Sequence, residues 1–277
     1  MKRFFSILAL LSGVIFGLEA SAQIAVAPLA IFADNQSRTG EMTIYNQGDK
    51  PKEIDIKLVY GYLDYDSVGN GYMRMSDSIT EKQNSIAPYV SVYPKKLVIQ
   101  PGQNQTIKIM VKNTSSLADG TYWTRIVTTS QDVKKQIDSS NRGDKVSVGI
   151  NIKFAMVSAF VFQKGKLNTK LNVDKFSTLS DSAKLNLLLN FSREGNSPFF
   201  GVCRWSVYDK EGDEVLKSED NFSAYFKGVK AFSIDKSKLK PGQYKATFAI
   251  SNELQDVPEE KRVPFEELRR DFEFTVQ

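Results

Sequence analysis

The sequence contains no histidine and only one cysteine, Cys203, among its 277 residues. Without histidine there is no imidazole base for a Ser-His-Asp or Cys-His catalytic site, and no imidazole ligand for a metal ion. A single cysteine excludes an internal disulfide and a zinc site built from several thiolates. The sequence therefore predicts no cofactor, no metal and no catalytic turnover, and an extracytoplasmic hydrolase is the least supported function.

A large excess of one charge is also missing. The chain has 37 Lys and Arg residues against 32 Asp and Glu residues, a formal charge of +5, and the first 22 residues contribute +1 of it through Lys2, Arg3 and Glu19. The remaining +4 is spread along the chain, whereas a nucleic-acid-binding protein is expected to show a concentrated basic stripe. Nucleic acid is therefore not an expected partner.

The longest apolar run covers residues 4–18, directly after Lys2 and Arg3. This run is short of the roughly 18–20 residues that a membrane-spanning helix needs. Small side chains at residues 20–22 then precede Gln23, as a signal peptidase requires. We predict a signal peptide over residues 1–22 and export to the periplasm, with no membrane span after cleavage.

Beyond residue 22, helical periodicity is nearly absent, and short extended segments are separated by Gly, Pro, Asn and Asp. This spacing of strands predicts antiparallel sandwiches of roughly 100 residues or a little more each. The expected strands of the first domain (23–163) are 24–32, 41–45, 53–63, 89–93, 95–99, 105–112, 121–129 and 145–162.

A second set of seven strands is expected at 167–173, 183–191, 203–208, 214–217, 231–234, 244–251 and 271–276, with a short helix within 258–270. Seven short strands are typical of an immunoglobulin-like sandwich, here placed at 164–277. The predicted fold is all-β, with two immunoglobulin-like β-sandwich domains in tandem. They are joined with almost no linker, so we expect a fixed cleft between them.

Residues 145–156 alternate almost perfectly between apolar and polar side chains. The apolar row is Val146, Val148, Ile150, Ile152, Phe154 and Met156, and Lys153 falls on the opposite face. Period-two alternation defines one face of a strand. The row either packs in the core of its own domain, or part of it is exposed at a sheet edge and offered to a partner.

Four segments of the first domain follow a recognisable order: 30–32 (Ala-Ile-Phe), 42–46 (Met-Thr-Ile-Tyr-Asn), 93–109 around the turn at Pro101 and Gly102, and 122–125 (Tyr-Trp-Thr-Arg). A polar stretch at 131–144 then precedes the alternating segment. In these features the chain resembles the PapD-like periplasmic chaperones of the chaperone–usher pilus pathway. The resemblance covers residues 24–162 and continues into the second domain.

The resemblance implies a chaperone that donates an edge strand to pilin-like subunits with incomplete β-sandwiches. The implied partner-binding residues are Val146, Val148, Ile150, Ile152, Phe154 and Lys153, with Lys153 holding the carboxylate at the subunit's terminus. The resemblance also suggests an outer-membrane usher as a further partner. The alternative is a structural or secretion-machinery component of the periplasm or cell surface, with the same two sandwiches.

Two departures from the family pattern stand out. Leu29 occupies the first-strand position where the family has an arginine that grips the carboxylate, and residues 64–87 form an insertion, expected to be a long hairpin or loop. Within the insertion, residues 64–69 resemble the start of a calcium loop, but Val68 stands where an Asp or Asn is needed. Ser233 and Lys236 have the spacing of a Ser-x-x-Lys nucleophile without any companion motif.

Overall fold

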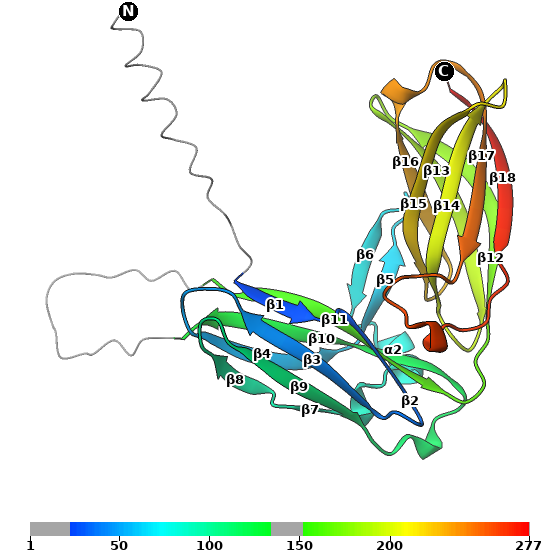
Figure 1. Cartoon of the computed structure of the whole chain (residues 1–277). Helices are drawn as coiled ribbons and strands as arrows, with labels where there is room; N and C mark the ends of the chain where they lie inside the picture. The colour runs from blue at the N-terminus through cyan, green and yellow to red at the C-terminus, as the bar shows by residue number, and fades with distance from the viewer. Residues whose placement is uncertain (1–22, 134–151, 277) are drawn as a thin grey trace, which may run out of the picture.

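The computed structural model describes residues 23–133 and 152–276, which are strands and turns apart from one short α-helix. The predicted signal peptide and the residues Val146, Val148 and Ile150 lie outside the described residues. The strands form two β-sandwiches joined end to end (Figure 1), so the predicted all-β fold is confirmed. No helix among the described residues has the length and apolar character needed to cross a membrane.

The first sandwich packs a four-stranded sheet on a five-stranded sheet. The four-stranded sheet has the order β1 (Ile24–Ala27), β3 (Thr39–Asn46), β9 (Asn104–Val111) and β7 (Val90–Tyr93). The five-stranded sheet has the order β2 (Ala30–Asp34), β11 (Phe154–Lys164), β10 (Gly120–Asp132), β4 (Lys52–Val59) and β8 (Lys96–Ile99). Alternate residues of both sheets fill the core, among them Met42, Ile44, Ile54, Ile107, Ile126 and Phe160.

The prediction of one continuous strand over residues 24–32 is wrong. The chain crosses from the four-stranded sheet to the five-stranded sheet at Pro28, so β1 pairs antiparallel with β3, whereas β2 pairs parallel with β11. Proline has no N–H to donate, so neither ladder continues through residue 28. The predicted strand 53–63 is also divided. It breaks at the buried Tyr60, next to Gly61, where a Cβ would lie only 3.0 Å from the carbonyl oxygen of Arg74.

The insertion predicted at 64–87, as a hairpin or loop, is part of a hairpin that starts three residues earlier, β5 (Gly61–Tyr65) with β6 (Gly71–Met75). The helix α2 (Ser78–Asn84) follows the hairpin. Asp77 caps the helix, because its carboxylate accepts from the backbone N–H groups of Ile79 and Thr80. Capping residues of this type satisfy N–H groups that the first turn leaves unpaired. The helix was not predicted from the sequence.

The second sandwich has the seven strands that were expected, and each strand is longer than the segment predicted for it from the sequence. One sheet has the order β12 (Thr169–Ser180), β13 (Lys184–Gly195) and β16 (Gly228–Asp235). The other has the order β15 (Glu214–Ala224), β14 (Phe199–Asp209), β17 (Gly242–Ser251) and β18 (Leu268–Val276). Only a single 3-10 turn (Glu259–Lys261) forms where a short helix was expected.

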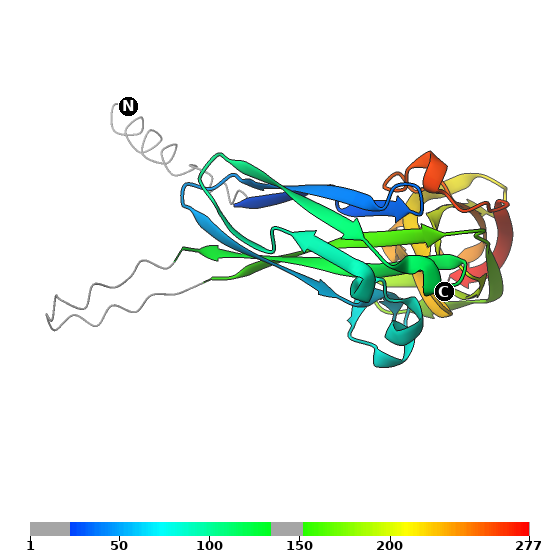
Figure 2. The same cartoon turned by 90° about the horizontal axis from the view of Figure 1, so that it is seen from below.

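The two sandwiches meet at an angle, with an aromatic cluster at their junction (Figures 1 and 2). Tyr60, Tyr62 and Trp123 of the first sandwich pack with Tyr225 and Phe226 of the second. Only four residues separate the end of β11 at Lys164 from the start of β12 at Thr169. The division of the chain at residues 163 and 164 remains a prediction, which this change of sheets supports.

Candidate functional site

Strand β11 is buried at its C-terminal half, whereas the described residues of the predicted apolar row lie at or before its N-terminal half. Phe160 and Phe162 are fully buried in the core of the first sandwich, and Met156 packs partly against it. By contrast, 53% of Phe154 and 60% of Ile152 are exposed. The described part of the row thus changes from partly core-facing at Met156 to exposed at Phe154 and Ile152.

In the part of the chain that the structure describes, the N-terminal half of β11 lacks a neighbouring strand on one side. β10 pairs with β11 along its whole length, from Lys164 to Phe154. β2 pairs with it only over Ala159–Gln163, beginning where the Ala159 N–H donates to the Leu29 carbonyl at 2.7 Å. Because the preceding strand β1 belongs to the other sheet, Phe154–Ser158 form an open edge among the described residues. We call these five residues the free edge of β11.

The backbone of the free edge is oriented for pairing. The Ala159 N–H points toward β2, and alternate residues of a strand direct their N–H and C=O groups to the same side. Ala155 and Val157 therefore direct their backbone groups toward the open side. An open row of this kind is a ready template for an added strand.

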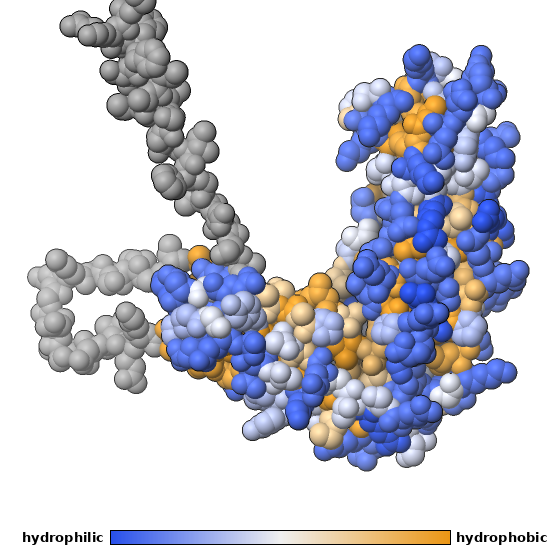
Figure 3. Space-filling model, in the orientation of Figure 1, coloured by the Kyte–Doolittle hydropathy of each residue, from blue (hydrophilic) through white to orange (hydrophobic). Residues whose placement is uncertain are grey.

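Small and branched apolar side chains surround this edge on the outer face of the sheet. Val157, 43% exposed, lies opposite Val127 on β10, and Ala155 and Ala159 flank it on the same face. We call these four residues the corner patch. Apolar surface is visible at the inner corner between the two sandwiches (Figure 3), and the same face carries the buried Val161 of the junction cluster.

Lys153 and Leu29 lie on either side of the free edge. Lys153 is exposed directly before β11 begins, and it has no ion pair within the described ranges 23–133 and 152–276. Leu29 is 56% exposed where the chain enters β2. A leucine side chain has no donor for a carboxylate, so Lys153 is the one predicted anchoring residue that carries a charge.

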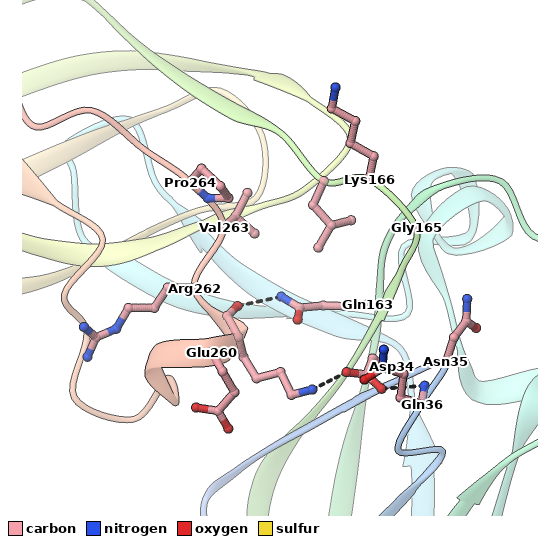
Figure 4. A pocket seen from close by; sticks show the side chains of 12 residues that line it. Asp34, Asn35, Gln36, Gln163, Gly165, Lys166, Glu260, Arg262, Val263 and Pro264 are labelled. Atoms are coloured by element: carbon pink, nitrogen blue, oxygen red, sulfur yellow. Dashed lines mark hydrogen bonds and ion pairs between the residues drawn. The ribbon is translucent and has the colours of Figure 1, made fainter.

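A polar pocket of about 620 Å³ lies at the junction of the sandwiches (Figure 4). Asp34, at the end of β2, forms an ion pair with Lys261, and Gln163 donates to the Lys261 carbonyl at 2.8 Å. Burial acts to raise the pKa of Asp34. The hydrogen bonds from Lys261 and from the backbone N–H groups of Ser37 and Gln36 outweigh burial, so the pKa lies below its ordinary value. These bonds tie the sandwiches together, and sequence reasoning missed them because no motif links residues so far apart.

Three side chains that the sequence singled out for possible chemistry, Cys203, Asp66 and Ser233, are buried or held by local hydrogen bonds. Cys203 is fully buried, and burial raises the pKa of its thiol to about 12. Asp66 accepts from the backbone N–H groups of Val68 and Asn70, which makes a turn where the sequence suggested a calcium loop. In the part of the chain that the structure describes, no three Cys, Asp or Glu side chains are grouped to hold a metal. Ser233 is hydrogen-bonded to Asn186.

Neither a protein-family model nor a curated protein matches the sequence. Among solved structures, the YadV chaperone matches 91% of this chain and 100% of its own, at 11% identity and a TM-score of 0.45. The class 5 fimbriae chaperone CfaA matches 89% of this chain and 97% of its own, at 13% identity and a TM-score of 0.45.

A third match is a chain of the CsuC–CsuE chaperone–tip adhesion subunit complex from the archaic chaperone–usher Csu pili of Acinetobacter baumannii. It covers 90% of this chain and 98% of its own, at 11% identity and a TM-score of 0.45.

Proposed function

We propose that this chain is a periplasmic chaperone for subunits of a surface fibre, and that it holds an incomplete β-sandwich by pairing with the free edge of β11. The observation that carries the proposal is the half-paired state of β11: among the described residues, Phe154–Ser158 have a neighbouring strand on one side only, beside exposed apolar side chains. Strand addition at such an edge supplies backbone hydrogen bonds along its length. No covalent chemistry is needed for this function.

The energy of capture follows from the side chains at the edge. Each large apolar side chain that becomes fully buried contributes roughly 1.5–3 kcal/mol before ordering costs are subtracted. Ile152 and Phe154 are exposed and available for such burial. In the proposal Val146, Val148 and Ile150 extend the same row, and Lys153 holds the carboxylate of the subunit. Export by the predicted signal peptide and delivery to an usher are further parts of the proposal.

The test uses the full-length chain with a C-terminal tag, expressed in its native host. Proteins that co-purify with the tagged chain are identified by mass spectrometry. Val157→Pro removes one N–H that points to the open side and leaves the ladder to β10 intact, because the N–H of Val157 does not take part in it. Val157→Ala is the control, since it shortens the side chain and keeps the N–H. We expect the proline variant to lose at least about tenfold in client affinity, equal to about 1.4 kcal/mol, at an unchanged melting temperature.

The identity of the client is part of the result. Capture of a subunit with an incomplete sandwich, lost in the proline variant and kept in the alanine control, supports the proposal. A client that binds the wild type and both variants equally would overturn the proposal and favour the alternative, a permanent component of a secretion or surface assembly.

A further inference from the structure

The second strand of the inserted hairpin, β6, is a further open edge on the concave side of the molecule. All five of its residues are exposed, and its sheet has only two strands. Its partner β5 lies against the second sandwich, where the Tyr65 hydroxyl donates to the Ser223 carbonyl at 3.1 Å. Figure 1 shows β6 on the side of β5 that faces away from the second sandwich, above the outer face of the sheet that contains β11.

The backbone groups of β6 that face outward belong to its odd-numbered residues. The Ser76 N–H donates to Tyr60 and the Asp66 N–H donates to Asn70, so the even-numbered residues of the hairpin exchange its hydrogen bonds. In an antiparallel ladder the intervening residues direct their N–H and C=O groups away from the partner. Met73 and Met75 therefore present these groups to the open side.

Unlike the longer edge strands β12 and β18, β6 carries no bulge, no proline and no unpaired charge. Natural edge strands are usually blocked by lysines, prolines, bulges or unpaired charges. Edge strand β12 has a bulge between Val173 and Lys175, and edge strand β18 carries the charged residues Arg269, Arg270, Asp271 and Glu273. In β6 the only charge, Arg74, is already paired with Asp64 at 2.5 Å.

Apart from Arg74, the exposed side chains of β6 are apolar or aromatic. Tyr72, Met73 and Met75 are 39%, 41% and 37% exposed, and the guanidinium of Arg74 lies 5.4 Å from the centre of the Tyr72 ring. Methionine side chains adapt to irregular apolar partners. The edge is therefore suited to an extended, uncharged segment.

We propose that β6 pairs with an extended apolar segment of the same client that β11 holds, so that the client is bound at two edges. This inference rests on the proposed function. It commits to the client because β6 and the corner patch both border the concave side, where a subunit paired to β11 has to lie. Because β6 carries no unpaired charge, we expect the client segment that pairs with it to be uncharged.

The test is Met73→Pro in the full-length chain, with Met73→Ala as the matched control. The proline removes one outward N–H and leaves the hairpin ladder intact, whereas the alanine removes the side chain and keeps the N–H. The probe is the complex of the chain with the client that co-purifies with it. We expect Met73→Pro to weaken client binding about tenfold, with unchanged melting, and Met73→Ala to weaken it less.

Hydrogen–deuterium exchange of peptides that span Gly71–Met75 supplies a second readout, and we expect these amides to be slowed in the complex. A client that depends on Val157 but leaves these amides and the Met73→Pro affinity unchanged overturns the inference and leaves the proposed function standing. If no client depends on Val157, both are overturned. A wild-type chain that forms a dimer in light scattering, and a monomer with Met73→Pro, would show that a second copy occupies this edge, which also overturns the inference.

Discussion

Arg125 is a buried cation at the junction, with only 8% of its surface exposed. It forms no ion pair with a carboxylate in the described residues. Its Nε donates to the Gly61 carbonyl and its Nη2 donates to the Tyr225 hydroxyl, each at 2.9 Å. A buried charge is tolerated only when its donors are satisfied. One phenol of the second sandwich thus satisfies a charge that belongs to the first.

We expect Tyr225→Phe to lower the free energy of unfolding by about 1.5–3 kcal/mol, because it leaves a buried N–H of a charged group without an acceptor. Tyr122→Phe is the control, since the Tyr122 hydroxyl donates to the Ala118 carbonyl at an exposed position. Urea denaturation of the full chain measures both variants. Equal effects of the two substitutions would show that the hydrogen bond between Arg125 and Tyr225 contributes no more to the free energy of unfolding than an exposed hydrogen bond does.

The hairpin β5–β6 depends on the glycine at its tip. Gly69 has a φ of +88°, and a Cβ at this position would lie 2.5 Å from the backbone nitrogen of Ala231 on β16. The Ala231 N–H donates to the Gly69 carbonyl at 3.1 Å. Glycine is therefore required here both for its conformation and for the close approach of two backbones.

Gly69→Ala should detach the hairpin tip from the second sandwich, so that the amide of Ala231 exchanges with solvent at least about tenfold faster, equal to about 1.4 kcal/mol. Gly212→Ala is a matched control, since Gly212 has a φ of +90° but no atom within 4 Å of its Cβ position. Hydrogen exchange measures both. If the two variants leave the Ala231 amide equally protected, the close approach at Gly69 does not hold the hairpin in place.

Local patterns predicted most of the strands but not their sheet partners. Short extended segments separated by turn residues were enough to predict the seven strands of the second sandwich. The open edge of β11 at Phe154–Ser158 could not be predicted in this way. It depends on where β2 starts to pair, and this is set by the crossing at Pro28, far away in the sequence. Val146, Val148 and Ile150 remain predictions.

The whole molecule is braced at two places on opposite sides of the junction. The hairpin lies on one side, and β2 with the turn Glu259–Lys261 lies on the other (Figure 2). The hairpin contacts the second sandwich through Tyr65, and Asp34 holds Lys261 by an ion pair. Between them lies the aromatic cluster, in which the rings of Trp123 and Tyr225 are 4.9 Å apart. Braces on both sides restrict bending between the sandwiches, so we expect a single interdomain angle.

One of these braces should depend on pH. The pKa of Asp34 is lowered in the folded chain, so its ion pair contributes stability above the ordinary carboxyl pKa, and that contribution is lost as the pH falls through the lowered value. We expect small-angle X-ray scattering to show a constant radius of gyration from pH 7 to about pH 4 and an increase at lower pH.

Asp34→Asn tests the same brace at neutral pH. It should lower the free energy of unfolding by about 1–3 kcal/mol, because the ammonium of Lys261 loses its charged partner in a partly buried position. Its radius of gyration at pH 7 should already exceed that of the wild type. An unchanged radius would show that the hairpin and the aromatic cluster fix the angle without the ion pair.

The continuity of β11 also determines how the molecule would respond to mechanical load. One strand carries the free edge at its start and leads directly into the second sandwich at its end. If the client is pulled along the direction of β11, the hydrogen bonds to β10 over Gly120–Ser130 are loaded in shear, all at once, and not opened one after another. Tension along the strand would thus be borne by the whole ladder, whereas a sideways pull would peel a client away pair by pair. The bound client would therefore resist a pull along β11 more strongly than a pull across it.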